Sequence, residues 1–497
     1  MSNNNNPNFF SNRDRNVFLL NMQSQLDRGA LLSRYSRTAN PDIRDLFDRE
    51  FLTNSGRGKE FYEKIFLEYG DESVAELVTV QAGIQNVSNV AVKIIEESRI
   101  GLSYLEKSSR YVRYDKKQNG RFPYLLFENT GLPDKFEESY KALMESLFIF
   151  YEQSLDKITA DLRERYPREQ FGKSGDKIAD KAYESALRAR TLDDLRAILP
   201  ASTLTNMGIS GNARSFISLI QRLSTSGLKE ASDLSDAIYS ELEEDYGQII
   251  RSARNKHGLN LIHYNKERND YFAYNPIHQD SCCKLISYGK SNLDRLPELL
   301  GMSHTEKSEF IRKAGDLRNG RRDKLPRIFE LVDLTYSLKM NYGIFREFQR
   351  HRFMGITRSP LGTSDGFQVP ELIKKNPELD KRFNSLVEES MKLHSDLLKA
   401  GANANAAQYV LPFCMYYTVL VHTNLRELVY YSELRTTPHA HADIRKLSLE
   451  MVDQFLNLEK ECTPIFKFLD RNEYPLGRYS QEYRKETKNE NLQKDTK

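Results

Sequence analysis

The chain has 497 residues, and its 73 lysines and arginines against 70 aspartates and glutamates leave a formal net charge of only +3. This balance excludes a global field that would attract nucleic acid or a membrane surface, so any recognition of an anion has to be local. The length is sufficient for two or three domains, and we expect two.

The N-terminal residues lack a basic stretch followed by an apolar run, and no segment reaches the roughly 18 apolar residues that a membrane helix needs. We therefore expect a soluble cytoplasmic protein without a membrane partner. The four cysteines form no C-x-x-C pair, which gives no support to a disulfide framework or a zinc site. We expect them to be reduced, with buried packing as their role.

In chain order, an Asn-rich start up to about residue 14 predicts disorder, and so does a polar, charged tail from about residue 478. Between these ends, amphipathic patterns such as those of residues 135–165 and 447–461 predict helices. The pattern favours a mostly helical α/β (α+β) fold with few strands.

Several landmarks recur in the same order in the two halves. Each half has a long apolar segment that opens at a glutamate and ends at an arginine, then a short run ending in Leu-Pro, then an Asn-x-Arg helix start. These lie at residues 76–99, 196–200 and 212–222 in the first half and at 330–352, 408–412 and 424–435 in the second. The repetition predicts two tandem copies, residues 15–255 and 280–475, joined by a polar, aromatic-rich segment without clear period at 255–280.

The tripeptide Arg350-His351-Arg352 comes after an apolar segment, residues 334–349, that has the length of a buried helix. Guanidinium groups match phosphate in bidentate fashion and an imidazole can hydrogen-bond beside them, so an anionic ligand is one interpretation. A solvated basic helix end is the other. The tripeptide alone leaves both open.

Ser103, Glu106, Ser108 and Arg110 occupy a turn-like stretch after a hydrophobic helix. Two hydroxyls, backbone amides and an arginine within eight residues can wrap a phosphate monoester. The alternative is a capped turn with a surface ion pair between Glu106 and Arg110.

Arg435 lies eleven residues after Asn424, in the segment YYSELRTTPHAHADIRK. A buried arginine there can stabilise negative charge developing on a bound ring. His439 and His441 have no third ligand at helical spacing, so ordinary packed or exposed histidines are favoured over a metal site. No phosphate-binding loop, dinucleotide fingerprint or hydrolase motif appears, so an enzyme would leave its difficult step to a cofactor.

The two half-signatures, R-H-R in one half and S-x-x-E-x-S-x-R in the other, resemble the flavin-dependent thymidylate synthases, where they are continuous. The resemblance covers about residues 17–475 and identifies the chain as a tandem, two-copy member with that family's fold. It implies FAD as cofactor, dUMP as substrate, and methylenetetrahydrofolate and NADPH as co-substrates in the methylation of dUMP to dTMP. It also implies a homodimer that mimics the family's four-subunit assembly.

When the family's residue roles are carried over by position, the candidate residues fall into three groups. Those implied to bind the flavin are Arg350, His351, Arg352, Asn424 and Arg426. Those implied to bind the nucleotide are Ser103, Glu106, Ser108, Arg110 and Arg196. Arg435 is implied to polarise the uracil ring, and no metal is implied.

The departures from the family pattern are complementary. The first copy replaces the tripeptide with residues 97–99 or 98–100, has Asp71 where the family has a leading histidine, and has Leu223 in register with Arg435. The second copy loses the Ser-Glu-Ser-Arg set and has Gln408 in place of Arg196. We therefore expect one complete site shared between copies, and leave open whether Arg99 takes over a flavin contact.

Two alternatives remain. One is a catalytically silent flavin- or nucleotide-binding paralogue with a regulatory or structural role, because a fold does not guarantee a function. The other is a different flavin enzyme that acts on a related nucleotide.

Overall fold

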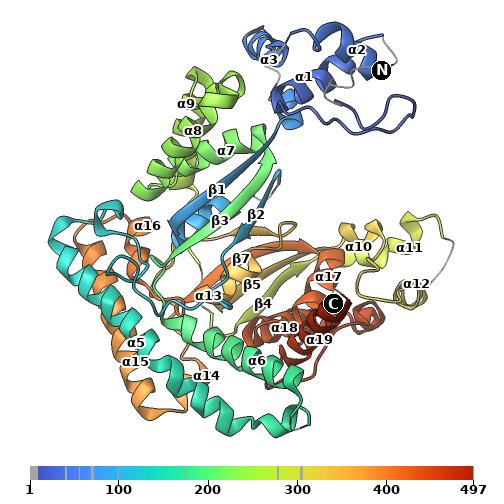
Figure 1. Cartoon of the computed structure of the whole chain (residues 1–497). Helices are drawn as coiled ribbons and strands as arrows, with labels where there is room; N and C mark the ends of the chain where they lie inside the picture. The colour runs from blue at the N-terminus through green and yellow to red at the C-terminus, as the bar shows by residue number, and fades with distance from the viewer. Residues whose placement is uncertain are drawn as a thin grey trace. The chain divides into compact units, whose positions relative to one another are not determined.

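The computed structural model (Figure 1) describes residues 9–39, 42–54, 56–68, 72–98, 100–173, 175–276, 279–302 and 306–495. Asp71 and Arg99, which the sequence singled out, lie outside these ranges. The chain forms two compact units. Unit 1 comprises residues 1–107, 129–131 and 205–272, and unit 2 comprises residues 108–128, 132–204 and 273–497.

Unit 1 combines a three-stranded sheet with helices. The strands are β1 (Thr79–Ser88), β2 (Leu102–Glu106) and β3 (Leu204–Asn212), in the order β1-β3-β2. The helices are α1 (Gln25–Tyr35), α2 (Ile43–Glu50), α3 (Arg57–Glu68), α4 (Asn89–Glu96), α7 (Ala213–Ser224), α8 (Lys229–Ile250) and α9 (Lys256–Tyr271). Short 3-10 turns are η1 (Glu72–Leu77) and η6 (Arg251–Ala253).

Unit 2 is larger and holds a four-stranded antiparallel sheet with the order β4-β5-β7-β6. Its strands are β4 (Cys283–Tyr288), β5 (Asp333–Asn341), β6 (Gly355–Thr357) and β7 (Tyr416–Asn424). Its longer helices are α5 (Glu137–Arg165), α6 (Lys177–Leu195), α12 (Lys307–Asp316), α13 (Tyr342–Phe348), α15 (Pro377–Lys399), α17 (Leu425–Arg435), α18 (Ala442–Leu458) and α19 (Tyr479–Asp495).

Shorter elements complete unit 2. The short helices are α10 (Lys290–Asp294), α11 (Leu296–Leu299), α14 (Glu371–Lys374) and α16 (Ala404–Ala407). The 3-10 turns are η3 (Asp134–Phe136), η4 (Arg168–Phe171), η5 (Arg196–Ile198), η7 (Arg327–Leu331), η8 (Gln408–Val410) and η9 (Lys460–Phe466), while η2 (Phe127–Asn129) falls where the chain passes from unit 2 to unit 1. The predicted class, mostly helical with small sheets, is confirmed.

A strand-to-helix corner recurs in both sheets. In each corner the last residue of the strand is also the helix N-cap, and its side chain accepts a hydrogen bond from a backbone N–H in the first helical turn. The four caps are Ser88 before α4, Asn212 before α7, Asn341 before α13 and Asn424 before α17. The order β5-β7-β6 in unit 2 repeats the order β1-β3-β2 in unit 1.

The core of unit 2 lies where helices cover the sheet. Tyr336 of β5 is fully buried, and its hydroxyl donates to the carbonyl of Met451 on α18, 3.0 Å away. On another side of the unit, α5 and α15 run side by side, with an edge-on contact between Phe150 and Phe383 (Figure 1). The packed sheet and its covering helices hold α13 and α17 in fixed positions.

Three expectations about local structure were wrong. The segment 334–349 is strand β5 followed by α13, because Leu334, Tyr336, Leu338 and Met340 alternate with the period of a strand before the Asn341 cap. The segment 255–280 contains helix α9, whose side chains are almost all at the surface. The polar tail is helix α19, which packs on α6, and the hydroxyl of Tyr479 donates to the carbonyl of Phe171 in η4.

The four cysteines are free, and three of them are buried. Within the described ranges, no cluster of three or more histidine, cysteine or acidic side chains is placed to hold a metal ion. No helix of the described part of the chain is both long and apolar enough to cross a membrane.

Candidate functional site

Helix α13 carries the centre of the candidate site. The side chain of Asn341 accepts from the backbone N–H of Ile344 at 2.8 Å and starts the helix directly at the end of β5. All seven residues of α13 are buried, including Arg346 and Glu347. A charged pair in a wholly buried helix needs partners from other elements.

Glu347 is the hub of a cluster of arginines. Its carboxylate accepts from Arg196 at 2.9 Å and from Arg110 at 3.3 Å, and Arg435 Nη1 lies 4.0 Å away. Burial alone would raise the pKa of Glu347, but Arg110 and Arg196 outweigh it and hold the pKa at about 2. The carboxylate is therefore ionised at neutral pH.

Arg110 also binds Asp193 on α6 in bidentate fashion, with Nε to Oδ1 at 2.6 Å and Nη2 to Oδ2 at 2.7 Å. Burial would raise the pKa of Asp193, yet Arg110 holds it far below its usual range. Burial lowers the pKa of Arg196 more than Glu347 raises it, but a guanidinium stays charged at neutral pH. The guanidinium groups of Arg110, Arg196 and Arg435 thus face the carboxylates of Glu347 and Asp193, which leaves an excess of one positive charge.

His351 and Arg435 form the second part of the cluster. Arg435 Nε donates to His351 Nε2 at 2.7 Å, and Arg435 Nη2 donates to the carbonyl of Glu347 at 2.9 Å. Because Nε2 accepts, the imidazole proton lies on Nδ1, which is 3.9 Å from the carboxylate of Glu427. Burial and then Arg435 hold the pKa of His351 well below its usual value, so the ring is neutral.

Glu427, in the first turn of α17, has a pKa well above that of an ordinary glutamate. Burial raises its pKa to about 7, although Lys324 and Arg426 act in the opposite direction. The rings of His351 and Tyr431 pack at right angles to each other, with centroids 4.6 Å apart. The site therefore contains a neutral imidazole beside a carboxyl group that titrates near neutral pH.

The other flavin candidates lie around this cluster in different environments. Arg350 and Arg352 are exposed where the chain leaves α13, as is Phe353 at 83%. Asn424 caps α17, accepting from the backbone N–H of Glu427 at 2.9 Å. Arg426 donates to Glu330 at 2.9 Å and to the carbonyl of Leu325.

The nucleotide candidates are divided between the units. Ser103 and Glu106 lie on strand β2 of unit 1, so the expectation that they sit in a turn was wrong. Ser103 is exposed, whereas Glu106 is buried with its carboxylate 3.3 Å from Lys93 Nζ. Ser108 belongs to unit 2, where its hydroxyl accepts from the backbone N–H of Arg110 at 3.3 Å. A surface pair between Glu106 and Arg110 is excluded, because each has other, buried partners.

Unit 2 thus brings together Arg110, Arg196, His351 and Arg435, which the sequence assigned to different copies. Sequence reasoning missed the two acids that hold them, Glu347 and Asp193. The signal for Glu347 was present: it is the one acid in the apolar run before the tripeptide. Asp193 gave no signal, because acids in an amphipathic helix are ordinary surface residues.

The two neighbouring histidines have structural partners. His441 caps α18, its Nδ1 accepting from the backbone N–H of Asp443 at 3.1 Å, and its Nε2 lies 3.4 Å from the carbonyl of Asp193. His439 lies 3.3 Å from the hydroxyl of Thr437. These contacts favour the interpretation of packed histidines.

Two hollows border the cluster. One of about 250 Å³ is lined by Asp193, Arg196 and His441, among others. The second, of about 660 Å³, is lined by Arg110, Asp193 and His439 together with α18. Both are large enough for part of a small ligand.

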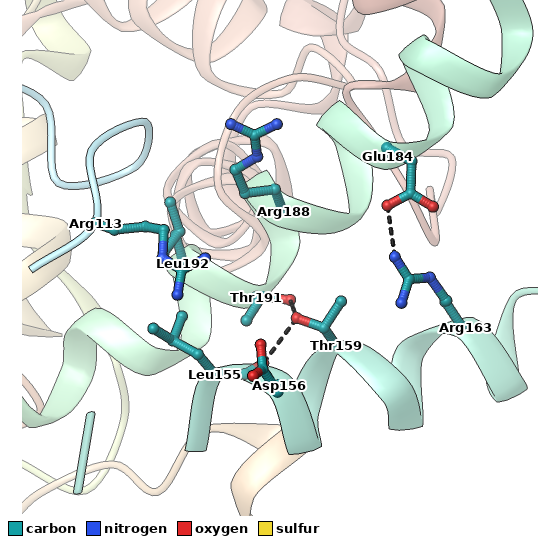
Figure 2. Close-up of a pocket in the computed structure, with 9 residues that line it drawn as sticks. All are labelled: Arg113, Leu155, Asp156, Thr159, Arg163, Glu184, Arg188, Thr191 and Leu192. Carbon is teal, nitrogen blue, oxygen red and sulfur yellow. Dashed lines mark hydrogen bonds and ion pairs between the residues drawn. The ribbon is translucent and has the colours of Figure 1, made fainter. Parts of the chain in front are cut away.

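A separate hollow of about 300 Å³ lies between α5 and α6 (Figure 2). There Arg163 pairs with Glu184 at 2.6 Å, and the hydroxyls of Thr159 and Thr191 are 3.1 Å apart. Its arginines are at the surface, and none of the residues predicted from sequence lines it. The cluster around Glu347 is therefore the stronger candidate.

A family model described as "Thymidylate synthase complementing protein" matches residues 23–246 and 275–458. The chain belongs to this family. The family model matches it in two tandem regions, as the repeat predicts.

Relatives fall into two groups. A "UPF0159 protein" of Thermoplasma acidophilum is 42% identical, and the match covers 93% of this chain and 99% of that protein. A "UPF0159 protein" of Chlamydia muridarum is 28% identical over 96% of each chain. A "Flavin-dependent thymidylate synthase" of Thermococcus onnurineus is 31% identical over 150 residues, which are 28% of this chain and 61% of that protein. These two UPF0159 proteins are matched over nearly their full length, and their names state no activity.

Proposed function

We propose that this protein is an FAD-dependent thymidylate synthase-like enzyme, which methylates dUMP to dTMP with methylenetetrahydrofolate and NADPH at one composite site. The observation that carries the proposal is the meeting of Arg110 and Arg196 with His351 and Arg435 around Glu347. Membership of the family and the partial similarity to proteins named flavin-dependent thymidylate synthases support it.

The charge of the cluster suits an anionic nucleotide. Its excess positive charge lies in a largely buried environment, where electrostatic interactions are stronger than in water. We propose that Arg110 and Arg196 bind the phosphate of dUMP by sharing their donors with Asp193 and Glu347. Within unit 2, Ser108 is proposed to complete the nucleotide contacts, while Ser103 and Glu106 of unit 1 remain predictions from the family resemblance.

The residues proposed for the flavin fit that group. The exposed guanidinium groups of Arg350 and Arg352 suit a diphosphate, which they can bind in bidentate fashion. His351, Asn424 and Arg426 are proposed to complete the contacts, with His351 acting through its bond to Arg435. FAD would supply the redox chemistry of the reaction, and the protein would supply binding, orientation and electrostatics.

Arg435 is the proposed catalytic residue. Its bonds to His351 Nε2 and to the carbonyl of Glu347 fix the direction of the guanidinium. A fixed cation placed where negative charge develops on the pyrimidine lowers the barrier without reorganisation. The neutral His351 can accept from Arg435 only while its own pKa stays low, which its burial ensures.

The test is the visible absorption spectrum of the purified protein with FAD, followed by titration with dUMP. We expect a bound-flavin spectrum that shifts as dUMP saturates, and formation of dTMP when methylenetetrahydrofolate and NADPH are added. Arg435→Gln should bind FAD but lose turnover, whereas Arg163→Gln, a surface control, should behave as wild type. Absence of bound flavin in the wild-type protein would contradict the proposal.

A catalytically silent flavin- or nucleotide-binding paralogue is the second candidate. Two observations favour it: Arg110 and Arg196 already have carboxylate partners, and the relatives matched over nearly the full length have names without an activity. It predicts a dUMP-dependent flavin spectrum, or nucleotide binding alone, without any dTMP.

A further inference from the structure

The 660 Å³ cleft has a wall that lies beyond the family-matched regions. Its lining comes from α6, from residues 438–440, from α18, and from residues 471–478, which lead into α19. The family model ends at residue 458, so the segment 471–478 adds residues from outside the family-matched regions to the cleft. Basic side chains in the lining are Arg110, Arg190, Arg445, Lys446, Arg471 and Arg478.

Arg478 is a buried cation without an acidic partner among the described residues. The residue is only 6% exposed, and its Nε and Nη1 atoms have no hydrogen-bond partner within the part of the chain that the structure describes. Its guanidinium lies over the ring of Tyr111, 4.4 Å from the centroid. Burying an unpaired charge is costly, so this side chain is prepared for an anion that the protein itself does not supply.

Arg445 lines the same cleft and differs from Arg478 in having an acidic partner, because Asp470 Oδ1 lies 3.9 Å from its Nη2. It is 8% exposed, and its Nη1 also has no partner among the described residues, although Nη2 donates to the carbonyls of Asp470 and Asn472. Six carboxylates also line the cleft, those of Asp193, Glu371, Asp443, Glu450, Asp453 and Glu473. Among them, Asp193 is bound by Arg110, Asp453 by Arg471, and Asp443 by Asn341 and Gln368.

The surroundings of His439, at one side of the cleft, are positive. Burial lowers the pKa of His439, and Arg321, Arg478, Arg110 and Arg435 lower it further. Four guanidinium groups are therefore close enough to disfavour a proton on one imidazole. The same guanidinium groups would attract an anion placed beside His439.

We propose that Arg478, with Arg445 as a second donor, binds a phosphate monoester in this cleft. The planar guanidinium offers Nη2 together with either Nε or Nη1 as a fork that matches two phosphate oxygens. The anion site does not depend on flavin chemistry. Its assignment to the phosphate of dUMP rests on the proposed function, and would make Arg478 a nucleotide-binding residue in addition to Arg110 and Arg196.

The test uses thermal unfolding of the full chain at constant ionic strength, with chloride replaced by inorganic phosphate or by dUMP. We expect both to raise the melting temperature of the wild-type protein, because a ligand that binds only the folded state stabilises it. Arg478→Gln should weaken the apparent Kd for inorganic phosphate by at least about tenfold. Arg471→Gln is the matched control, because Arg471 lines the same cleft but is paired with Asp453.

A purely structural role for Arg478 predicts a different result. In that case Arg478→Gln would melt below the wild type without phosphate, whereas removal of an uncompensated charge should leave the melting temperature unchanged or higher. Equal phosphate-induced shifts in wild type and Arg478→Gln would overturn the proposal, as would no shift in the wild type. A response to phosphate without one to dUMP would support the anion site and contradict its assignment to the nucleotide, whatever the flavin spectrum shows.

Discussion

Replacing Glu347 by glutamine should destabilise unit 2 by an amount that depends on pH. The carboxylate neutralises Arg110 and Arg196 in a buried environment, and its pKa lies at about 2 instead of the ordinary 4.5. At about 1.4 kcal/mol per pKa unit, this shift corresponds to about 3 kcal/mol of stability at pH 7. That magnitude agrees with the roughly 3–5 kcal/mol lost when one partner of a buried pair is removed.

The direction of this pH dependence follows from the linkage between folding and protonation of Glu347. Because the folded protein lowers the pKa, the stabilisation is fully present above pH 4.5 and is lost as the pH falls through about 2. The difference between wild type and Glu347→Gln should therefore be largest at neutral pH and fall to less than half by about pH 3.

Hydrogen–deuterium exchange of peptides covering α13 measures the local loss of stability caused by Glu347→Gln. After correction for the intrinsic rate at each pH, Glu347→Gln should exchange roughly a hundredfold faster than wild type at pH 7. Glu184→Gln is the control, because its ion pair with Arg163 is half exposed and contributes at most about 1 kcal/mol. Equal exchange in wild type and Glu347→Gln, or a difference that does not shrink in acid, would refute the reasoning.

Other features of the molecule give three more predictions. Burial raises the pKa of Glu427 to about 7, so the contribution of this residue to stability should fall as pH rises from about 4.5 to 7. Relative to the wild type, Glu427→Gln should therefore melt higher at pH 8 but not at pH 4, and parallel pH profiles of the two proteins would contradict this. Tyr479→Phe should lose about 1 kcal/mol, measured by calorimetry, because the carbonyl of Phe171 loses its donor, and an unchanged protein would mean that α19 is not held there. Sedimentation equilibrium should give twice the mass of the chain, as the expected homodimer requires, and a monomer would exclude that assembly.

The sequence located the arginines of the cluster but not what holds them. Arg110 and Arg435 were chosen because guanidinium groups bind anions, and Arg196 because of the family resemblance. The structure brings all three to Glu347. A sequence pattern indicates which residue types have the chemistry to bind an anion. It does not indicate which buried acid meets which buried base, because those contacts depend on elements more than 80 residues apart, such as Arg110 and Asp193.

The errors in secondary structure have a related cause. Residues 334–349 were predicted as one helix because β5 is covered on both faces, so residues between its inward-pointing side chains are buried as well and the alternation is weak. The tail was predicted as disordered from its charge, but Tyr479 and Tyr483 give α19 an aromatic contact with the rest of unit 2. Two aromatic residues in a polar stretch do not change its composition enough to alter the prediction.

In the four strand-to-helix corners, the strand is followed directly by the helix, with no loop residue between them. Because Asn341 ends β5 and also caps α13, inserting one residue at this junction would turn the helix by about 100° about its axis and carry Glu347 away from Arg110 and Arg196. The same insertion before α17 would swing Arg435 off His351. Substitutions can therefore accumulate at the site positions of either copy, whereas the corners tolerate almost no change in length. Insertions should be confined to loops that do not connect a strand directly to the helix that follows it.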